Sequence, residues 1–272
     1  MKQTVIFQAL KEDIGDGDVT TLATIPKSQI LSGYFLAKAS GVASGLDVVE
    51  QVFTTLNNKI AFTTKITNGS IIKKGDVLAS IKGPGISILE GERVALNFLQ
   101  RMSGIATLTR QFVDVVKNTH AIILDTRKTM PGLRVFDKQA VKDGGGQNHR
   151  FGLFDMFLIK DNHIAAAGSV TKAISDVKKA NKKNLLIEVE VNTFEQLREA
   201  LLQRPDRIML DNMSLDEIRR AVKLIAGQVP IEVSGGVNLQ TVLEIAQTGV
   251  DYISIGALTH SVKALDISLE IA

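Results

Sequence analysis

The sequence predicts an α/β protein in which a small, largely antiparallel β region precedes an open, incomplete (β/α) barrel. Two observations predict this class. From Ile122 onward, short apolar runs alternate with helical patterns, which is typical of repeated βα units around a parallel sheet or barrel. Before residue 105, Thr- and Gly-rich runs are punctuated by Gly69, Gly75 and Gly83, as in tight turns between antiparallel strands.

The first hundred residues begin with a short predicted helix and the polar loop GDGDVTT, whose aspartates lack the spacing of a calcium loop. We interpret that cluster as a polar loop or a helix terminus. Strands are expected within SGYFLAKASGVASG and FTTKITNGSIIKKGDVLASIKG, and a helix from about Ile88 to Gln100, with a second helix beginning at Ser103. This pattern predicts an N-terminal domain (1–104) and a barrel domain (105–272), with a C-terminal segment able to pack back on the former.

Six apolar segments are predicted to form the barrel strands: 121–124, 155–159, 185–191, 207–210, 231–233 and 251–255. The helices between them have recognisable starts. Ser214 with Glu217 matches a capping box, and Asn238 is expected to cap a helix that Gly249 ends. Six or seven strands are fewer than the eight of a closed barrel, so we expect an open one.

Composition excludes several functional classes. The chain has 272 residues, a formal charge of +3, two Tyr and no Trp, whereas nucleic-acid binding calls for a clustered basic face with stacking aromatics. The absence of cysteine excludes disulfides, thiolate metal sites and a Cys nucleophile, and it suits a reducing compartment. No apolar run approaches the length of a membrane span. We therefore expect a soluble, cytoplasmic protein with neither nucleic-acid nor membrane partners.

Cationic residues are concentrated between Asp125 and His163, in DTRKTMPGLR, GGGQNHR and LFDMFLIKDNH. Solvated basic surfaces usually lie along one face of an amphipathic helix, whereas these charges follow the apolar runs AIIL and MFLI. Cations at strand ends predict a pocket for a small, multiply anionic ligand. The cationic residues of this stretch are Arg127, Lys128, Arg134, His149, Arg150 and Lys160.

Acidic residues also lie on or at the ends of the predicted strands. In LLIEVEVN, Glu188 and Glu190 share one face of a strand whose apolar neighbours predict burial. Buried carboxylates need partners, which the nearby cations can supply. Asp211 ends the apolar run RIML, where a helix-capping role and a functional role are equally open. Because the C-terminal strand ends form the active face of barrel enzymes, we expect a site there.

The last two strands are followed by loops that predict a phosphate site. VSGGVN places Ser234, Gly235 and Gly236 before an expected helix, where backbone N–H groups can face an anion. SIGALTH repeats the arrangement with Gly256 and Ala257. Because glycine is common in turns, either loop alone would be weak evidence for a phosphate site. Both loops in this order, at the end of a barrel pattern, predict phosphate binding.

The four histidines show no metal-ligand spacing. His149 and His260 adjoin the anion-type motifs and are the better candidates for ligand contact, whereas His120 is expected on a surface loop.

Taken together, these motifs resemble the quinolinate phosphoribosyltransferase family, also called nicotinate-nucleotide pyrophosphorylase (carboxylating). The resemblance covers nearly the whole chain, through EDIGDGDVTT, ERVALNFLQRMSGIAT, DTRKTMPGLR, GGGQNHRFGL, LIKDNHI, IEVEV, LDN, SGG and GVDYISIGALTHS. It implies a Mg²⁺-dependent enzyme of NAD biosynthesis. Such an enzyme transfers the phosphoribosyl group of phosphoribosyl pyrophosphate to quinolinate and releases nicotinate mononucleotide, pyrophosphate and carbon dioxide.

The resemblance also implies an N-terminal α/β sandwich domain joined to an open α/β barrel. It further implies a homodimer, with higher assembly left open, in which the partner's N-terminal domain completes each active site. Carried over by motif, the quinolinate-binding residues are Arg93, Arg127, His149, Arg150 and Lys160, with Arg93 coming from the other subunit. The catalytic residues are Lys128, at substrate or pyrophosphate, and Glu190 and Asp211, at the ribose hydroxyls and Mg²⁺, directly or through water or substrate. The 5′-phosphate is held by Ser234, Gly235, Gly236, Gly256, Ala257 and His260.

Two rival interpretations stay open. A paralogue linked to molybdenum transport shares this fold, but a changed substrate should have changed the cationic set, which is complete here. A non-catalytic phosphate-ligand sensor would leave Glu190 and Asp211 without a purpose. Two positions depart from the family pattern: Gln139 stands where an aromatic residue is usual, and Val233 where a small one is usual. Neither falls on a predicted site residue.

Overall fold

The predicted α/β class is confirmed by the computed structural model, which describes residues 2–272. Two compact units are formed by interleaved parts of the chain. Unit 1 comprises the residues up to Arg110, Thr129–Gly145 and Leu258–Ala272, and unit 2 comprises Gln111–Lys128 and Gly146–Ala257.

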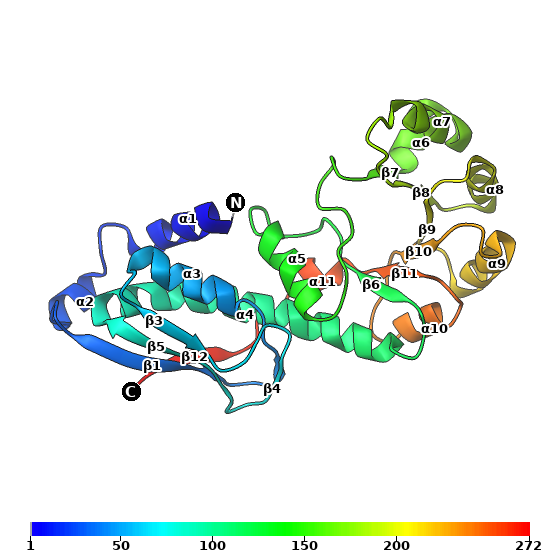
Figure 1. Ribbon diagram of the computed structural model, residues 1–272. Coiled ribbons are helices and arrows are strands. Elements are labelled where there is room, and N and C mark those ends of the chain that lie inside the picture. Colours follow the sequence, from blue (N-terminus) through cyan, green and yellow to red (C-terminus); the bar gives the residue numbers. More distant parts are fainter. Residues whose placement is uncertain (1) are drawn as a thin grey trace. The chain divides into compact units, whose positions relative to one another are not determined.

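Unit 1 contains a four-stranded antiparallel sheet in the order β12-β1-β5-β3, together with the small antiparallel pair β2-β4 (Figure 1). The strands are β1 (Ile30–Ala37), β2 (Gly41–Val42), β3 (Ala61–Thr64), β4 (Ile71–Ile72), β5 (Val77–Pro84) and β12 (Ile267–Ile271). The helices are α1 (Lys2–Ile14), α2 (Val19–Thr24), α3 (Leu46–Leu56) and α5 (Arg134–Asp143). Two further helices, α4 (Gly85–Val116) and α11 (Ala257–His260), contain residues of both units.

Helices α2, α3 and α4 differ from the structure that the sequence predicts for the N-terminal region. The Asp18 side chain caps α2, accepting from the amides of Thr20 and Thr21 at 3.0 and 3.1 Å, so the VTT part of the expected loop is helical. Helix α3 was not predicted; it buries Val48, Val49, Val52 and Phe53 on one face.

The helix expected from about Ile88 to Gln100 and the helix expected to begin at Ser103 are one continuous helix, α4. A Cβ at Gly104 would lie 2.2 Å from the carbonyl oxygen of Lys263. Glycine is therefore required here for a close approach of two backbone segments, and it does not break the helix.

Unit 2 contains a six-stranded, all-parallel sheet in the order β6-β11-β10-β9-β8-β7. Its strands are β6 (Ile122–Leu124), β7 (Phe157–Ile159), β8 (Ile187–Val191), β9 (Arg207–Asp211), β10 (Ile231–Ser234) and β11 (Tyr252–Ser254). All six predicted strands are thus confirmed. Within the described residues β6 and β7 are the two edges and do not pair, so the barrel is open.

Helices cover the outer side of this sheet (Figure 1). They are α6 (Asp161–Ala167), α7 (Val170–Ala180), α8 (Phe194–Gln203), α9 (Leu215–Ile225) and α10 (Val242–Ala246). The capping box of Ser214 and Glu217 is confirmed at the start of α9. The prediction for Asn238 is wrong: its side chain accepts from the amides of Gln240 and Thr241 in a tight turn, and α10 begins only at Val242.

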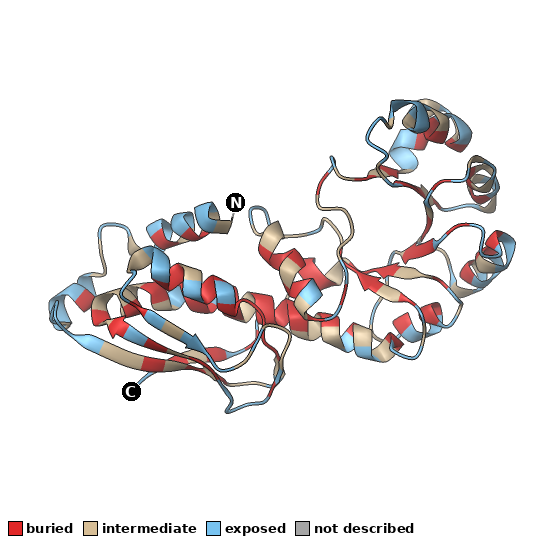
Figure 2. Ribbon diagram, in the orientation of Figure 1, coloured by how far each residue is buried: buried red, intermediate tan, exposed pale blue. Residues whose placement is uncertain are grey.

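The two faces of the parallel sheet differ in polarity. The outer face is apolar and fully packed under the helices, as with Val189 at 0%, Leu210 at 0% and Val233 at 2% exposure. The inner face carries Glu188 and its register partner Arg207, which must point the same way because they are directly opposite. In Figure 2 the strands of this unit are largely coloured as buried. The apolar core of unit 2 therefore lies mainly outside the barrel, whose interior is partly ionic.

One segment crosses the opening of the barrel. Gln147 forms an isolated parallel bridge with Leu124 of β6, and ten residues later the chain enters β7 at the opposite edge of the sheet. The segment 147–156 therefore links the two edges, and it carries His149 and Arg150. Among residues 2–272, no helix combines the length and the apolar character that a membrane crossing requires.

Candidate active site at the strand ends of unit 2

Most of the predicted site residues belong to unit 2 and gather at one edge of its sheet. The strands are parallel, so their C-terminal ends share that edge. Asp125 follows β6, Lys160 follows β7, and Glu190 is the penultimate residue of β8. Asp211 and Ser234 end β9 and β10 and are direct register partners.

Lys160 and Glu190 form an ion pair, with the ammonium nitrogen 2.7 Å from a carboxylate oxygen. The Lys160 side chain is 43% exposed and that of Glu190 13%. The amide of Lys160 donates to the Nδ1 atom of His163 at 2.9 Å, which fixes the turn into α6. The ammonium group is therefore held at the strand-end edge and is still open to solvent.

Arg127 and Arg150 form a second cationic feature. Both are partly buried. Burial lowers the pKa of Arg150, and the positive charge of Arg127 lowers it further, whereas Asp155 and Glu188 act in the opposite direction. A guanidinium stays protonated despite such a shift. Two like charges held near each other in a partly dehydrated place favour a bound anion, which relieves their repulsion.

Asp125 shapes the segment that carries His149. Its side chain is completely buried and accepts hydrogen bonds from the backbone amide of His149, at 2.9 Å, and from the Asn148 side chain. This strand-end carboxylate therefore holds the crossing segment beside β6.

Beneath this edge lies a buried ionic cluster that the sequence analysis identified only in part. The Nε2 atom of His149 lies 3.0 Å from a Glu188 oxygen and 3.6 Å from a Glu232 oxygen. Arg207 donates to Glu232 at 2.9 Å, and its guanidinium lies 3.9 Å from the centre of the Tyr252 ring. Sequence reasoning anticipated Glu188 but missed Arg207 and Glu232. The signal was available, because Arg207 shares a strand face with Asp211, and Glu232 with Ser234.

The pKa values of the two carboxyl groups of this cluster are both raised. Burial raises the pKa of Glu188 to about 7 and, together with the charge of Glu188, raises the pKa of Glu232 to about 7. Both carboxyl groups therefore bind a proton more readily than an exposed glutamate does, and the positive charge of Arg207 opposes this shift.

The loops after β10 and β9 pack against each other through a glycine. Gly235 has a φ of 96° and Gly236 a φ of 63°. A Cβ at Gly235 would lie 2.2 Å from the Asn212 side-chain oxygen, and the Asn212 amide donates to the carbonyl of Ser234 at 3.0 Å. Glycine is therefore required at this position by both backbone conformation and space.

The helix expected directly behind the SGG loop begins later in the chain, and the helix behind Gly256 is short. Helix α10 begins six residues after Gly236, and α11, which begins at Ala257 directly after Gly256, has only four residues. The reason is local, since the Asn238 turn interrupts the chain between the SGG loop and the helix. Any anion here would meet the amides of the loops themselves.

Two predicted site residues lie in unit 1. Arg93 is exposed on α4, and His260 is exposed at the end of α11 with Nδ1 2.7 Å from the Ser261 hydroxyl. Arg134 also belongs to unit 1 and donates to Thr129 at 3.0 Å. Lys128 is exposed in unit 2, and its amide donates to the Thr126 hydroxyl at 3.1 Å.

The two departures from the family pattern lie elsewhere. Gln139 is on α5 of unit 1, where its amide donates to Asp47 at 3.2 Å. Val233 points to the outer face of the sheet and is 2% exposed. Neither reaches the strand-end edge.

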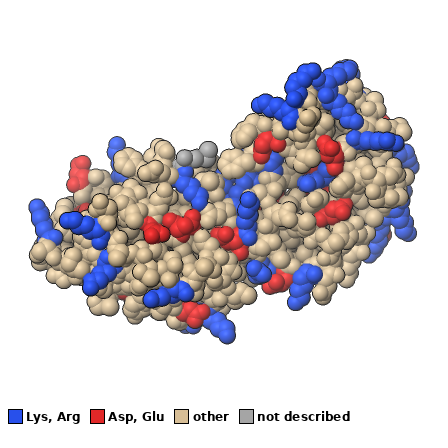
Figure 3. All heavy atoms as spheres, in the orientation of Figure 1, with Lys and Arg blue, Asp and Glu red and all other residues tan. Residues whose placement is uncertain are grey.

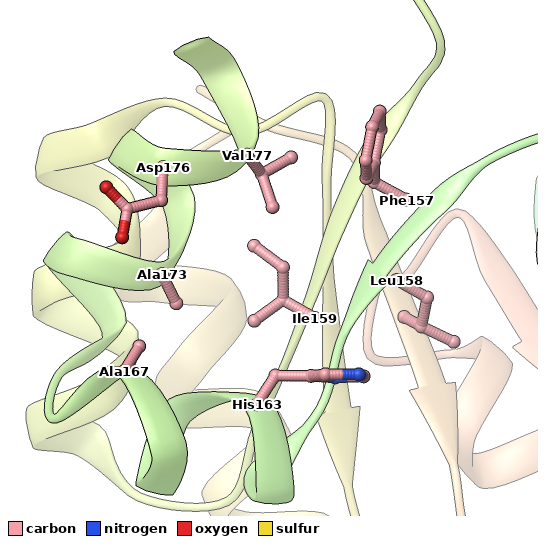
Figure 4. Close-up of a pocket in the computed structure, with 8 residues that line it drawn as sticks. All are labelled: Phe157, Leu158, Ile159, His163, Ala167, Ala173, Asp176 and Val177. Carbon is pink, nitrogen blue, oxygen red and sulfur yellow. The ribbon is translucent and has the colours of Figure 1, made fainter. Parts of the chain in front are cut away.

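A separate cavity of about 260 Å³ lies between β7 and the helices α6 and α7 (Figure 4). Phe157 and Ile159 line it from the strand, and Ala167, Ala173 and Val177 from the helices. Among the described residues that line it, none is Lys or Arg, so it lacks the charges of an anion site. Lys and Arg side chains gather instead on the solvent side of α6 and α7, as Figure 3 shows at upper right.

Comparisons with known proteins match this chain to a single family over nearly its full length. Residues 18–103 and 105–270 match the N-terminal and C-terminal domains of quinolinate phosphoribosyl transferase, respectively. The mitochondrial quinolinate phosphoribosyltransferase (decarboxylating) 2 of Nicotiana glauca is 48% identical over 286 residues, which cover 98% of this chain and 81% of the relative. The probable nicotinate-nucleotide pyrophosphorylase (carboxylating) of Bacillus subtilis (strain 168) is 45% identical over 260 residues, covering 96% and 90%.

A crystal structure of NadC from Streptococcus pyogenes matches the fold with a TM-score of 0.95 at 41% identity, covering 98% of this chain and 95% of that one. With two matching family domains and relatives of this identity and coverage, the chain belongs to the quinolinate phosphoribosyltransferase family.

Proposed function

We propose that this chain transfers the phosphoribosyl group of phosphoribosyl pyrophosphate to quinolinate and decarboxylates the product to nicotinate mononucleotide, in the biosynthesis of NAD. The observation that carries the proposal is that a cationic group and two carboxylates lie at the same edge of the sheet. Lys160 stands against Glu190, and Asp211 stands beside the glycine loop that begins at Ser234. This layout suits an anionic acid next to a sugar phosphate.

Quinolinate is a dianion, and its two carboxylates would meet Arg127, Arg150 and Lys160, with His149 in the same pocket. Arginine matches a carboxylate with two parallel N–H donors, and lysine supplies a point charge. Lys128, exposed after β6, would contact substrate or the pyrophosphate. The loops of Ser234, Gly235, Gly236, Gly256 and Ala257 would cradle the 5′-phosphate through backbone amides, with His260 as a further contact.

The proposed chemistry needs no protein nucleophile. The pyridine nitrogen of quinolinate forms a bond to the anomeric carbon as the bond to pyrophosphate breaks, and the leaving pyrophosphate keeps the electron pair. Positive charge develops on the ribose ring, where Glu190 and Asp211 would stabilise it. The bond to the adjacent carboxylate then breaks, carbon dioxide leaves, and the electron pair, stabilised by the pyridinium nitrogen, is finally taken up by a proton.

Glu190 and Asp211 are also the residues that fit Mg²⁺. Both offer carboxylate oxygens at neighbouring strand ends, Glu190 being partly buried and Asp211 partly exposed. Magnesium in such enzymes is held by one or two carboxylates, water and substrate phosphates, so a site with two carboxylates and open space suits it. When bound, the ion neutralises charge on the pyrophosphate leaving group.

We further propose a homodimer in which Arg93 of the partner subunit completes the quinolinate site, with higher assembly left open. Exposure of Arg93 on α4 supports this, since an exposed guanidinium is accessible to another chain. A cytoplasmic location is also proposed, on the ground that a chain without cysteine suits a reducing compartment. Cell fractionation would test the location.

The decisive experiment measures release of carbon dioxide from carboxyl-labelled quinolinate in the presence of phosphoribosyl pyrophosphate and Mg²⁺, with nicotinate as the control substrate. Release that requires both substrates is the expected result. Quinolinate binding without release would favour a sensor, and absence of quinolinate binding would favour a paralogue with another substrate. Withdrawal of the metal with a chelator should stop release, and added Mg²⁺ should restore it.

A further inference from the structure

The hydrogen bonds of His149 define the protonation of its ring. The backbone amide of Arg150 donates to Nδ1 of His149 at 2.7 Å. An amide N–H can only donate, so Nδ1 must accept and carries no proton. A neutral imidazole has one N–H, which must therefore be on Nε2. That N–H points to Glu188, whose carboxylate oxygen lies 3.0 Å away.

This tautomer excludes two roles for His149 as it stands here. The ring cannot be an imidazolium, because a proton on Nδ1 would meet the N–H of Arg150. It also cannot be a metal ligand through Nε2, although ligand atoms of His149, Glu188 and Glu232 lie within 4.8 Å of one another. Metal ligation needs the lone pair of Nε2, which the proton occupies.

Both ring nitrogens are thus engaged inside the protein, and the side chain is only 6% exposed. The hydrogen-bond partner of Nε2 is held in a fixed position, since Glu188 belongs to β8 and its side chain is 1% exposed. On the other side of the ring, Nδ1 accepts a hydrogen bond from the backbone amide of Arg150. The carboxylate of Asp125 accepts one from the backbone amide of His149. Two consecutive amides of the crossing segment are therefore attached to the strands of the sheet.

We infer that His149 is a positioning residue, which acts on the anionic substrate only through Arg150 by tying the Arg150 backbone to Glu188 inside the barrel. This inference rests on the proposed function for the identity of the substrate. It assigns Glu188 to the same positioning chain, and it removes His149 from direct contact with the substrate carboxylates.

A double-mutant cycle on quinolinate binding, followed by calorimetry without phosphoribosyl pyrophosphate, tests the inference. His149→Ala should weaken binding by about tenfold to hundredfold, as loss of an outer-shell partner does at other charged sites. The variant H149A/R150A should bind no more weakly than R150A alone, because the effect of His149 passes through Arg150. Losses that multiply would show an independent contact and overturn the inference.

Two further variants separate the two ring nitrogens. In H149N the side-chain oxygen can stand where Nδ1 accepts, and in H149Q the amide nitrogen can stand where Nε2 donates. Each variant keeps only one of the two contacts through which His149 ties Arg150 to Glu188, so we expect both to bind quinolinate more weakly than wild type. Binding as tight as wild type in either variant would overturn the inference.

Long-range ¹H–¹⁵N NMR of the His149 ring supplies a readout that does not depend on activity. The wild-type ring should be the neutral Nε2–H form both before and after quinolinate is added. An imidazolium in the complex would overturn the inference. If the wild-type protein neither binds quinolinate nor releases carbon dioxide, the proposed function fails, while the spectrum of the free protein still decides the tautomer.

Discussion

The ammonium group of Lys160 lies 2.7 Å from the carboxylate of Glu190, across the β7–β8 pair at the strand-end edge of unit 2. Because Lys160 is 43% exposed, this ion pair contributes little to folding, less than about 1 kcal/mol. The pair instead fixes the position of a partly exposed cation at the strand-end edge.

Replacement of Lys160 by alanine should therefore affect turnover far more than stability. We expect kcat/KM for quinolinate to fall by about 10³-fold, or about 4 kcal/mol, because a charge that meets a substrate carboxylate is lost. Unfolding in urea should change little. Lys172→Ala, in the exposed pair with Asp176 on α7, is the matched control and should leave both quantities unchanged. Normal turnover in K160A would remove Lys160 from the site.

Sharing of active sites between subunits can be tested by mixing two inactive variants, Arg93→Ala and Lys160→Ala. Random reassociation gives mixed dimers in half of the molecules, and each mixed dimer has one intact site, so about a quarter of wild-type activity should return. Steady-state assays before and after mixing provide the measurement. Verified heterodimers that stay inactive would count against a shared site.

Glu232→Gln should change how stability depends on pH. Its pKa is raised to about 7 by burial and by the charge of Glu188, so the folded state binds a proton that the unfolded state releases near 4.5. The stability associated with this proton is complete below about pH 4.5 and is lost as the pH rises through about 7. Relative to wild type, E232Q should therefore gain about 1–3 kcal/mol at pH 8 compared with pH 5.

Urea unfolding at the two pH values measures this difference. Glu217→Gln provides a control of opposite sign, because hydrogen bonds from Ser214 lower the pKa of Glu217. Its contribution to stability is present above its ordinary pKa and is lost in acid, so E217Q should be weakened at pH 8. Parallel pH curves for E232Q and wild type would contradict the burial of a proton-binding carboxyl group.

Arg101→Met should destabilise unit 1 strongly. Arg101 makes two hydrogen bonds to Asp137, at 2.9 and 2.8 Å, and the Asp137 side chain is completely buried. Removing the cation leaves an unpaired buried carboxylate, at a cost of about 3–5 kcal/mol. Denaturant unfolding measures this cost. The control Arg198→Met removes the cation of an exposed pair on α8 and should leave the free energy of unfolding unchanged. A variant R101M as stable as wild type would mean that the pair is dispensable.

Gly104→Ala should destabilise the protein even though alanine is the better helix former. The new methyl group would meet the Lys263 carbonyl at 2.2 Å, and such overpacking costs about 1–3 kcal/mol or more. Asn97→Ala, on the exposed side of the same helix, should be neutral or slightly stabilising. Thermal unfolding of the two variants compares them directly. Equal stability of G104A and wild type would show that the backbone segments can separate at no cost.

Local periodicity was enough to predict the strands of unit 2 and the side chains at their ends. Alternation along LLIEVEV correctly placed Glu188 and Glu190 on one face and Val189 on the other. The same rule, applied to RIMLD and IEVS, would have found Arg207 and Glu232, since each shares a face with a site residue two or four positions later.

Features that depend on distant contacts could not be predicted in this way. The helix break expected between Gln100 and Ser103 is absent, and the reason for glycine at position 104 is Lys263, about 160 residues away along the chain. The crossing of segment 147–156 between the sheet edges depends on strand order, which the sequence does not state. That both ring nitrogens of His149 have protein partners is likewise visible only in the fold.

The position of β12 in the chain has a consequence for biosynthesis. This strand pairs with β1 along Gly33–Ala37, yet about 230 residues separate the two in sequence, including all of unit 2. At a translation rate of about 5–20 residues per second, β1 waits on the order of ten seconds or more for its partner. During that time its edge is unpaired and open to other strands. The ribosome therefore completes the sheet of unit 1 last, and nascent chains stalled before Ile267 are the ones that chaperones must protect from aggregation.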